Sequence, residues 1–300
     1  MADRRPLENA TVKLPRGRFA LSVDVEDYFQ VWAFSEIISR ESWDGYQLRV
    51  GDMTRTCLDI FDRHGAQATF FTLGWVAERD PDIIREIVSR GHEIASHGYD
   101  HTKVNQQTPE EFRADAAKTK RILEDISGVE VTGYRAAGFS IDKSTPWAHE
   151  ILHELGHRYS SSEHPIAHDH YGDANAMQSP HYPVSGAEFI EAPVATVDFA
   201  GRRLSCAGGG WFRAFPLPVT KIFLKRAKKK LSGPVIFYFH PWEIDVDQPR
   251  IAGASTRSKF RHYLNLGRME KKLENLLSTF EWTRIDYALG VNAAERMNGG

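Results

Sequence analysis

RFALSVDV, the stretch at residues 18–25, is a short apolar and β-branched run that ends in acidic residues. This composition is typical of a buried strand whose carboxyl end opens onto a site. Four further runs of the same kind follow, at Ala68–Leu73, Glu93–Ser96, Val131–Tyr134 and Val235–Phe239. Helical patterns separate them, so the sequence predicts a parallel α/β sheet or barrel with its sites at the carboxyl ends of the strands.

The helices between these strands are marked by local start and stop signals. Gly65 ends the first helix, Asp80-Pro81 opens the second, and Thr108 with Glu111 forms a capping box at the start of the third. We expect helices at Thr54–His64, Asp82–Arg90, Thr108–Gly128, Thr145–Leu155, Thr220–Lys230 and Ser258–Ser278, with a last strand near Trp282–Ile285.

The length of 300 residues allows one large domain or two ordinary ones. The alternation of strands and helices favours a single domain over residues 18–290, with a flexible arm at 1–17 and a tail at 291–300. Residues 160–218 interrupt the alternation because they are rich in His, Pro, Gly and Ser. We predict that they form an irregular insertion over the mouth of the barrel, and that the chain ends in a helical extension.

Composition excludes several classes of protein. A net charge of -2 gives no overall electrostatic case for nucleic-acid binding. The two cysteines, Cys57 and Cys206, are too few for a disulfide framework, and no run of 18 apolar residues predicts a transmembrane helix. The first 18 residues lack the apolar stretch of a signal peptide, so we expect a cytoplasmic protein. The basic run Lys225–Lys230 is typical of a solvated helix end, with contact to an anionic glycan or to a membrane surface as the alternative.

Two histidines with metal-ligand spacing follow one of the predicted strands. In the segment SHGYDH, His97 and His101 stand at i and i+4 and would face the same way on one helical turn. Zn²⁺ takes His nitrogen together with Asp or Glu oxygen, and a catalytic site leaves one position open for water. Neighbouring histidines are also common on ordinary surfaces, so the pair needs carboxylates from elsewhere in the chain.

Those carboxylates are predicted at the end of the first strand, where Asp24, Glu26 and Asp27 lie within four residues. Three acids are costly to bring together at a buried strand end unless a cation or an arginine compensates their charge. An exposed acidic turn is the alternative, but the residues before and after the cluster are apolar. The pattern therefore favours a functional site.

Other candidates follow later strands. Arg135 could hold a carboxylate of the acidic cluster ionised, and His240 could give a proton to a leaving group. Each could also be an ordinary structural residue. The aromatic neighbours could form a rim on which sugars stack, although such residues more often belong to the core: Tyr28, Phe29, Trp32 and Trp242.

The order of these elements resembles the polysaccharide deacetylases of carbohydrate esterase family 4, which have the NodB-homology fold. The closer likeness is to deacetylases encoded with exosortase systems and exopolysaccharide loci. It rests on SVDVEDYFQV, ATFFTLGWVAER, GHEIASHGYDH, GYRAAGFSID, FYFHPWEIDVDQPRI and FRHYLNLGRMEKKLENLL, which span most of the chain. The resemblance implies a distorted (β/α)₇ barrel that removes acetyl groups from sugars with the help of a divalent metal ion, for which Zn²⁺ fits the ligand types.

The resemblance also implies roles for individual residues. Asp24 is the expected base, Arg135 orients it and His240 is the expected proton donor, while His97 and His101 hold the metal ion. A backbone N–H near Phe139 and Ser140 is expected to stabilise the oxyanion. The substrate contacts implied or suggested in this way are Tyr28, Phe139, Ser140 and Trp242.

The sequence departs from the family pattern at three places. The base is followed by Val25 instead of a second aspartate; strand alternation favours Glu26 as the third metal ligand, with Asp27 as the alternative. The segment HRYSSS at residues 157–162 has no acid that could tune His240. Arg135 precedes two alanines and not a proline-containing turn, which leaves the oxyanion donor open.

We therefore predict a metal-dependent polysaccharide deacetylase that acts on an acetylated glycan in exopolysaccharide biosynthesis. One alternative is an amidohydrolase of a small C–N substrate. The other is a glycan-binding protein without turnover, which the altered acidic motif keeps open. Acetylated polymer is normally met at or beyond the inner membrane, so a lipid-linked precursor at the cytoplasmic face would reconcile the substrate with the expected location.

Overall fold

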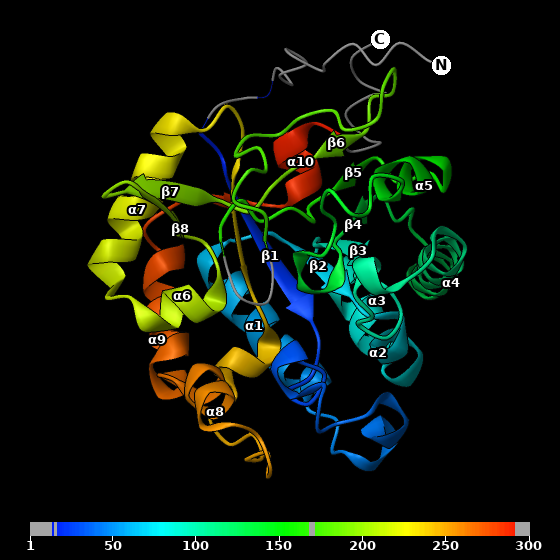
Figure 1. Cartoon of the computed structure of the whole chain (residues 1–300). Coiled ribbons are helices and arrows are strands. Elements are labelled where there is room, and N and C mark those ends of the chain that lie inside the picture. Colours follow the sequence, from blue (N-terminus) through cyan, green and yellow to red (C-terminus); the bar gives the residue numbers. More distant parts are fainter. Residues whose placement is uncertain (1–13, 15–16, 168–171, 292–300) are drawn as a thin grey trace.

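The computed structural model describes residues 14, 17–167 and 172–291, and its centre is a curled parallel sheet (Figure 1). The strand order is β10-β1-β2-β3-β4-β5-β6, and β9 pairs with β1 as well. Every residue of β1 is buried, as expected for a strand covered on both faces. The strands of this sheet are β1 (Phe19–Val25), β2 (Ala68–Thr72), β3 (Glu93–Ser96), β4 (Gly133–Tyr134), β5 (Tyr159–Ser160), β6 (Ile190–Glu191), β9 (Val235–Phe239) and β10 (Trp282–Thr283).

The sheet curls toward closure because the chain after β6 returns to β9. The Ala195 N–H donates to the carbonyl of Ile236 at 3.1 Å, and the Tyr238 N–H donates to the carbonyl of Ala207 at 2.8 Å. These bonds bring the segment between β6 and β9 against the open side of β9. The predicted distorted α/β barrel is confirmed.

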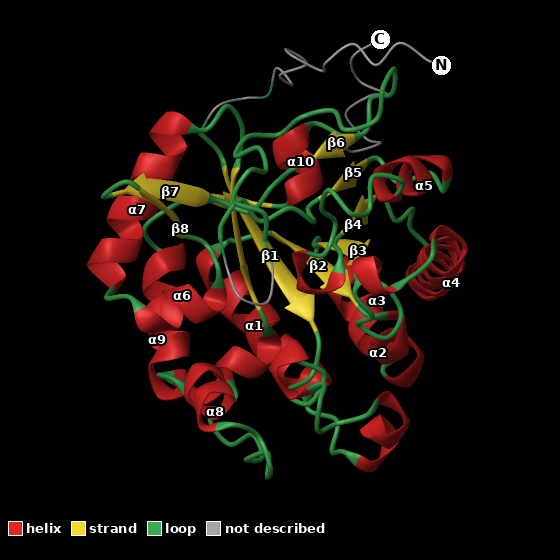
Figure 2. Ribbon diagram, in the orientation of Figure 1, coloured by secondary structure: helices red, strands yellow, loops and turns green. Residues whose placement is uncertain are grey.

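Helices surround the strands, as Figure 2 shows in red around yellow. The helices are α1 (Val50–His64), α2 (Gly74–Arg79), α3 (Pro81–Ser89), α4 (Pro109–Ser127), α5 (Ala148–Glu154), α6 (Gly209–Ala214), α7 (Leu217–Lys230), α8 (Thr256–Tyr263), α9 (Met269–Leu277) and α10 (Ile285–Leu289). Gly65 ends α1 and Gly128 ends α4, both in the left-handed conformation, and the Asp80 carboxylate caps the start of α3. The Thr108–Glu111 capping box is present, so these predicted signals are confirmed.

Two helix predictions need correction. Helix α1 begins at Val50 and not at Thr54, because the Asp27 carboxylate accepts the N–H groups of Arg49 and Val50 from a distant part of the chain. The predicted helix at 258–278 is in fact α8 and α9. They are separated by Asn265 in the left-handed conformation and a 3₁₀ turn at Leu266–Arg268.

The segment 160–218, predicted to be irregular, contains regular structure. It includes the end of β5, strand β6, helix α6 and an antiparallel hairpin of β7 (Thr196–Phe199) and β8 (Arg202–Ser205). Strands β5 and β6 are only two residues long, too short for a recognisable pattern of alternation. The predicted arm at 1–17 and tail at 291–300 fall almost entirely outside the described residues.

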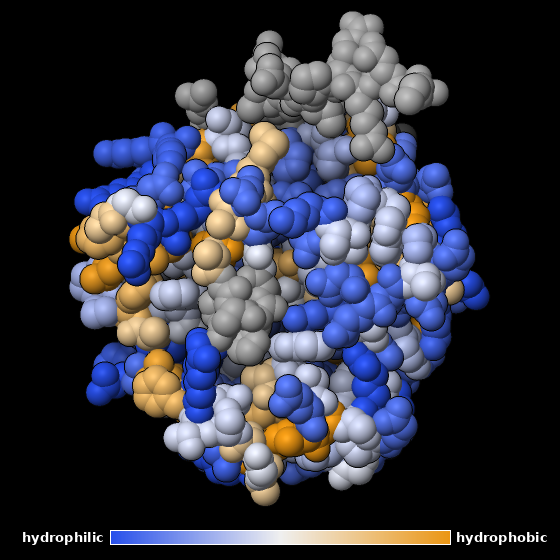
Figure 3. Space-filling view, viewed as in Figure 1, coloured by the Kyte–Doolittle hydropathy of each residue, from blue (hydrophilic) through white to orange (hydrophobic). Residues whose placement is uncertain are grey.

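The described helices include none that is both long enough and apolar enough to cross a bilayer. On the face shown in Figure 3, hydrophilic residues predominate and hydrophobic residues gather in small separate areas, one of them on the side of α7. Ile222 on α7 and Phe199 on the neighbouring hairpin are about half exposed.

Candidate active site

The register of the parallel strands brings the predicted site residues to one edge. Val25 pairs with Thr72, Thr72 pairs with Ser96, and Ser96 pairs with Tyr134. Each strand therefore ends at the same level, and the residue that follows it lies at the carboxyl edge marked by the arrowhead of β1 (Figure 1). Among those next residues are Glu26, His97, Arg135 and, after β9, His240.

Three buried side chains at this edge form a candidate metal centre. Glu26, His97 and His101 each offer a ligand atom, and these atoms lie within 4.8 Å of one another. His101 Nε2 is 3.1 Å from Glu26 Oε2. The His97 Nδ1 atom lies 2.8 Å from the carbonyl of Arg135, which orients the ring and leaves Nε2 as the ligand atom.

The electrostatics and hydrogen bonding of this group fit a divalent cation. Burial lowers the pKa of His97, and lowers that of His101 to about 4, so both rings are neutral at pH 7 as metal ligands must be. Glu26 Oε2 is buried and accepts no hydrogen bond from the described residues, although His101 Nε2 lies 3.1 Å from it. A cation would compensate that buried charge, and two imidazoles with one carboxylate form a catalytic zinc ligand set.

Asp27, the alternative third ligand, lies outside this group. Its carboxylate accepts the backbone N–H of Tyr28 at 2.8 Å, of Arg49 at 2.6 Å and of Val50 at 2.8 Å. The chain bends directly after β1, where the Glu26 N–H donates to the carbonyl of Asp24, and this bend turns Asp27 toward the start of α1. The geometry thus corrects the assignment of Asp27 to the metal centre.

Asp24 stands beside the candidate metal centre and is held by Arg135. Arg135 Nη1 donates to Asp24 Oδ1 at 2.6 Å, and both side chains are buried. Burial alone would raise the pKa of Asp24, but the positive charge of Arg135 and the nearby His97 and His240 lower it below its usual value. Asp24 is therefore anionic at neutral pH, as a general base must be.

Two serines that the sequence did not single out hold Arg135 in place. Ser22 Oγ accepts from Arg135 Nη1 at 2.9 Å, while the Ser161 carbonyl and hydroxyl accept from Nε and Nη2 at 3.1 and 3.0 Å. The Arg135 guanidinium also lies over the ring of Phe71, 4.1 Å from its centroid. The HRYSSS segment, which has no acid to contact His240, thus holds Arg135 through Ser161.

His240 faces the acidic residues across the site. Its Nε2 atom is 3.3 Å from Glu26 Oε1 and 3.9 Å from Asp24 Oδ2, while Nδ1 is 2.8 Å from Glu243 Oε1. Burial would lower the pKa of His240, but the carboxylates of Glu26, Glu243 and Asp24 outweigh it and raise the pKa to about 9. A protonated imidazole at pH 7 is suited to proton donation.

Glu243 is a further residue that sequence reasoning missed. The His-Pro-Trp-Glu spacing has the form of a capping box, and it places Glu243 against both the backbone N–H and the ring of His240. That spacing is the feature of the sequence from which the contact between Glu243 and His240 could have been predicted. Arg213, which pairs with Glu243 from helix α6, left no signal because it approaches from 30 residues away.

A groove of about 470 Å³ opens beside His240. Trp242, a predicted substrate contact, lines it and also stacks on the His240 ring at a centroid distance of 5.2 Å. Phe260 is 66% exposed at the groove, which makes its ring available to a ligand. The aromatic residues of the lining are Trp32, Trp211, Tyr238, Trp242 and Phe260.

The other three predicted substrate contacts belong to the core or to loop structure. Tyr28 is 2% exposed and its ring packs against Phe29. The Phe139 N–H donates to the carbonyl of Ala136, so it is not a free oxyanion donor. Ser140 Oγ accepts from the Val104 N–H and thereby ties the loop after His101 to the loop after Arg135.

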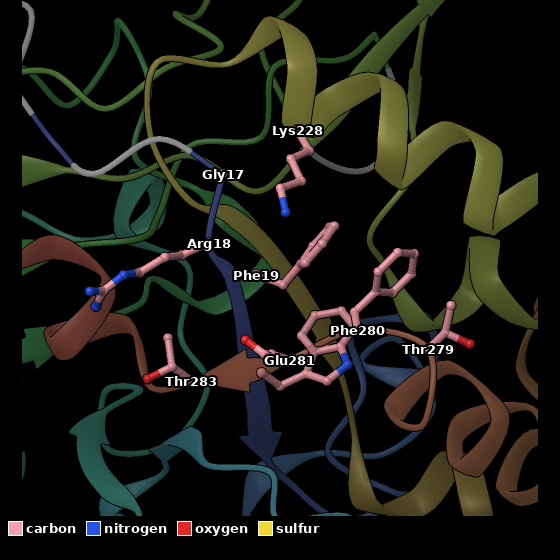
Figure 4. A pocket seen from close by; sticks show the side chains of 9 residues that line it. Gly17, Arg18, Phe19, Lys228, Thr279, Phe280, Glu281 and Thr283 are labelled. Atoms are coloured by element: carbon pink, nitrogen blue, oxygen red, sulfur yellow. The ribbon is translucent and has the colours of Figure 1, made fainter.

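A second cavity, of about 560 Å³, lies at the opposite edge of the sheet (Figure 4). Phe19 at the start of β1, Lys228 and Phe280 line it, whereas Asp24 is at the other end of β1. None of the predicted site residues lines this cavity.

Comparison with known proteins divides the chain into two matched parts. Residues 44–160 match the polysaccharide deacetylase family, and residues 161–290 match a family described only as a domain of unknown function, DUF3473. The site uses both parts and the strand before them, because Asp24 and Glu26 precede the first match and His240 lies in the second.

Individual relatives support the first match. A peptidoglycan-N-acetylglucosamine deacetylase of Bacillus cereus is 33% identical over 100 residues, which is 33% of this chain and 36% of the relative. A chitooligosaccharide deacetylase of Bradyrhizobium is 26% identical over 99 residues, 33% of this chain and 43% of the relative. The aligned region thus spans less than half of either relative's length.

A solved structure extends the likeness to the whole fold. The crystal structure of a Mycobacterium smegmatis protein classed with the polysaccharide deacetylases superposes with a TM-score of 0.61 and 20% identity, covering 96% of this chain and 95% of that chain. At this identity the match concerns the fold alone. The chain thus shares the fold of that protein over nearly its whole length, and its residues 44–160 resemble the polysaccharide deacetylase family.

Proposed function

We propose that this chain is a metal-dependent hydrolase that removes acetyl groups from an acetylated polysaccharide or its precursor. The observation that carries the proposal is the position of Asp24, which Arg135 holds at 2.6 Å beside the Glu26, His97 and His101 group and 3.9 Å from His240. A base, a metal ligand set and a proton donor are thus within reach of one substrate group. The names of the deacetylase relatives support this reaction class.

The candidate metal centre would consist of Glu26, His97 and His101. A divalent ion such as Zn²⁺ bound there would lower the pKa of a water molecule and polarise the acetyl carbonyl. The carbonyl of Arg135 holds the ring of His97 in the required orientation. Ser140 ties the loop that follows His101 to the neighbouring loop, which limits the movement of that ligand.

Two side chains of the protein would move the protons. Asp24, kept anionic by Arg135, would take a proton from the attacking water through Oδ2, because Oδ1 is bound to the guanidinium. His240 would give a proton to the departing amine or alcohol from Nε2, because Nδ1 is held by Glu243. The Asp24 Oδ2 and His240 Nε2 atoms lie 3.9 Å apart, so both would be within reach of one tetrahedral intermediate.

The groove beside His240 favours a glycan of several sugars as the substrate. Its aromatic rings could cover the apolar faces of sugar rings next to the acetylated one, and Lys103 adds a polar contact at the Trp32 side. The resemblance of the sequence motifs further supports a polymer of exopolysaccharide biosynthesis. A small C–N substrate would leave most of this groove unused.

Acetate release tests the proposal. The protein is treated with a chelator and incubated with N-acetylglucosamine oligomers and with an O-acetylated xylan, with and without added Zn²⁺, Co²⁺ or Mn²⁺. We expect acetate from at least one polymer and recovery of activity on adding metal. Release from small amides alone would favour the amidohydrolase, and unchanged glycan binding without any acetate would favour a binding protein.

A further inference from the structure

We propose that Glu243 and Arg213 are positioning residues that orient His240 as the proton donor, and that Gly209 makes the space that the Glu243 carboxylate needs. This inference rests on the proposed function. It assigns a role to residues of the segment 161–290, whose family is described only as a domain of unknown function.

Two hydrogen bonds join Glu243 to His240. Glu243 Oε1 is 2.8 Å from His240 Nδ1 and accepts the His240 backbone N–H at 3.1 Å. The Glu243 side chain is fully buried, so water does not compete for these bonds. The carboxylate therefore fixes the tautomer, with hydrogen on Nδ1, and the direction in which Nε2 points.

Arg213 holds the other oxygen of the same carboxylate. Its Nε donates to Glu243 Oε2 at 2.6 Å, and its Nη1 donates to the carbonyls of His262 at 2.8 Å and Leu264 at 2.6 Å. The guanidinium is thus bound at the carboxyl end of α8 as well as to Glu243. A buried charge pair whose donors are directed in this way is held in one geometry.

Stacking fixes the plane of the imidazole. The Trp242 ring stacks on the His240 ring, with 21° between the two planes. On its other contact the Trp242 ring stacks on His262, with 4.2 Å between the ring centroids and 13° between the planes. The hydrogen bond to Glu243 sets the rotation of the His240 ring within that plane. Together these contacts direct Nε2 toward Asp24 and Glu26.

The glycines of helix α6 explain how a carboxylate and an arginine reach this position. A Cβ on Gly209 would overlap the Glu243 carboxylate, and a Cβ on Gly208 would come within 2.9 Å of the Tyr238 ring. Gly209 and Arg213 are four residues apart and share one face of α6. The helix therefore packs its glycine against Glu243 and sends its arginine to the same carboxylate one turn later.

The proton balance of the step is complete with groups already in the site. As the C–N or C–O bond of the tetrahedral intermediate breaks, its electron pair goes to the departing nitrogen or oxygen, which takes the proton from His240 Nε2. The imidazole becomes neutral, and the proton that Asp24 took from water restores it. Glu243 keeps its hydrogen bond to Nδ1 throughout and remains ionised.

Leaving-group dependence separates a positioning role from a structural one. A 4-nitrophenyl acetate leaving group departs without protonation, whereas the amine of an N-acetylated sugar does not. We expect Glu243→Gln to lower kcat on the N-acetylated oligosaccharide by at least tenfold with little change in KM, because Gln cannot accept from both His240 and Arg213. Its kcat on 4-nitrophenyl acetate should stay within about threefold.

Glu191→Gln is the matched control. Glu191 is also fully buried and lies 3.0 Å from an imidazole nitrogen, that of His149, in a pair separate from His240. This variant should lower both activities by the same factor. Gly209→Ala is the second test variant, and we expect it to reproduce the Glu243→Gln pattern by displacing the carboxylate.

The outcomes are distinguishable. Equal losses on both substrates in Glu243→Gln and in Gly209→Ala would overturn the positioning role while leaving the deacetylase proposal intact. If Glu243→Gln does not fold, Gly209→Ala alone decides between these results. A wild-type protein that releases acetate from neither substrate would overturn the proposed function, and this inference with it.

Discussion

Arg135 donates a 2.6 Å hydrogen bond to Asp24 although the two residues are 111 positions apart in the sequence. The contact arises because β1 and β4 end at the same edge of one sheet, so the residues near their carboxyl ends converge. Burial raises the pKa of Asp24, and the positive charge of Arg135, with His97 and His240, reverses that effect. Several properties of the site depend on this pair.

Replacement of Asp24 tests its role as the base. We expect Asp24→Asn to retain one equivalent of metal and to lose about 10²- to 10⁴-fold in kcat, because an amide cannot take a proton from water. Metal content by elemental analysis and acetate release are measured on the same sample. Turnover near the wild-type level would show that another group is the base.

Replacement of Arg135 tests the ion pair itself. Arg135→Met leaves a buried carboxylate without its partner, which generally costs about 3–5 kcal/mol of unfolding free energy. The double variant Arg135→Met, Asp24→Asn removes both charges and should recover a large part of that loss. Urea unfolding of the two single variants and the double variant measures the coupling; simple additivity would contradict it.

The acidic residues next to Asp24 should separate into metal binding and stability. Glu26→Gln should weaken metal binding, with activity partly restored by excess metal, because a neutral ligand compensates a divalent charge less well. Asp27→Asn should keep the metal but lose about 1–2 kcal/mol of stability, since an amide nitrogen cannot accept the N–H bonds that one carboxylate oxygen accepts. Metal loss in Asp27→Asn and not in Glu26→Gln would reverse the assignment.

Sequence reasoning pointed to the residues of the candidate site because they follow strands directly. His97, Arg135 and His240 each come immediately after a run of apolar residues, and parallel strands place such positions at one edge. The choice between Glu26 and Asp27 was also accessible, since alternation puts Asp24 and Glu26 on one face of the strand.

The remaining features depend on contacts between distant segments. Asp27 fixes the start of α1, and Arg213 binds the carboxyl end of α8 while reaching Glu243. Neither contact has a local pattern, because the partners are 23 to 49 residues apart in the sequence. Short strands such as β5 depend on their neighbours for the same reason, since two residues carry no periodicity.

The pH dependence of stability should reflect Glu93, which is buried at the amino edge of the sheet. Its carboxylate accepts from Thr69 and from Tyr159, and burial together with the nearby Asp286 raises its pKa to about 8. A carboxyl whose pKa is higher in the folded state stabilises the fold below its unfolded pKa near 4.5. That contribution is lost as pH rises toward 8.

Glu93→Gln should therefore remove a decline in stability between about pH 5 and pH 8. The slope in the wild type is at most about 1.4 kcal/mol per pH unit from this single group. Urea unfolding of both proteins at pH 5.5, 7 and 8.5 measures the difference. Parallel stability curves for the two proteins would show that Glu93 does not titrate in this range.

The aromatic groove should make activity depend on the length of the glycan. Trp211 and Phe260 line the groove from helix α6 and helix α8, and Phe260 is 66% exposed there. Loss of one sugar contact worth about 1.4 kcal/mol corresponds to about tenfold in kcat/KM. We expect Trp211→Ala and Phe260→Ala to lose about this much on a hexasaccharide and little on a disaccharide, which is too short to reach the far end of the groove. Phe199→Ala is the control because Phe199 is similarly exposed, at 46%, but lies on the β7–β8 hairpin outside the groove lining. Equal losses on both oligomers would place the longer glycan on another surface, whereas loss on the hexasaccharide alone would identify the groove as the path of the chain beyond the acetylated sugar.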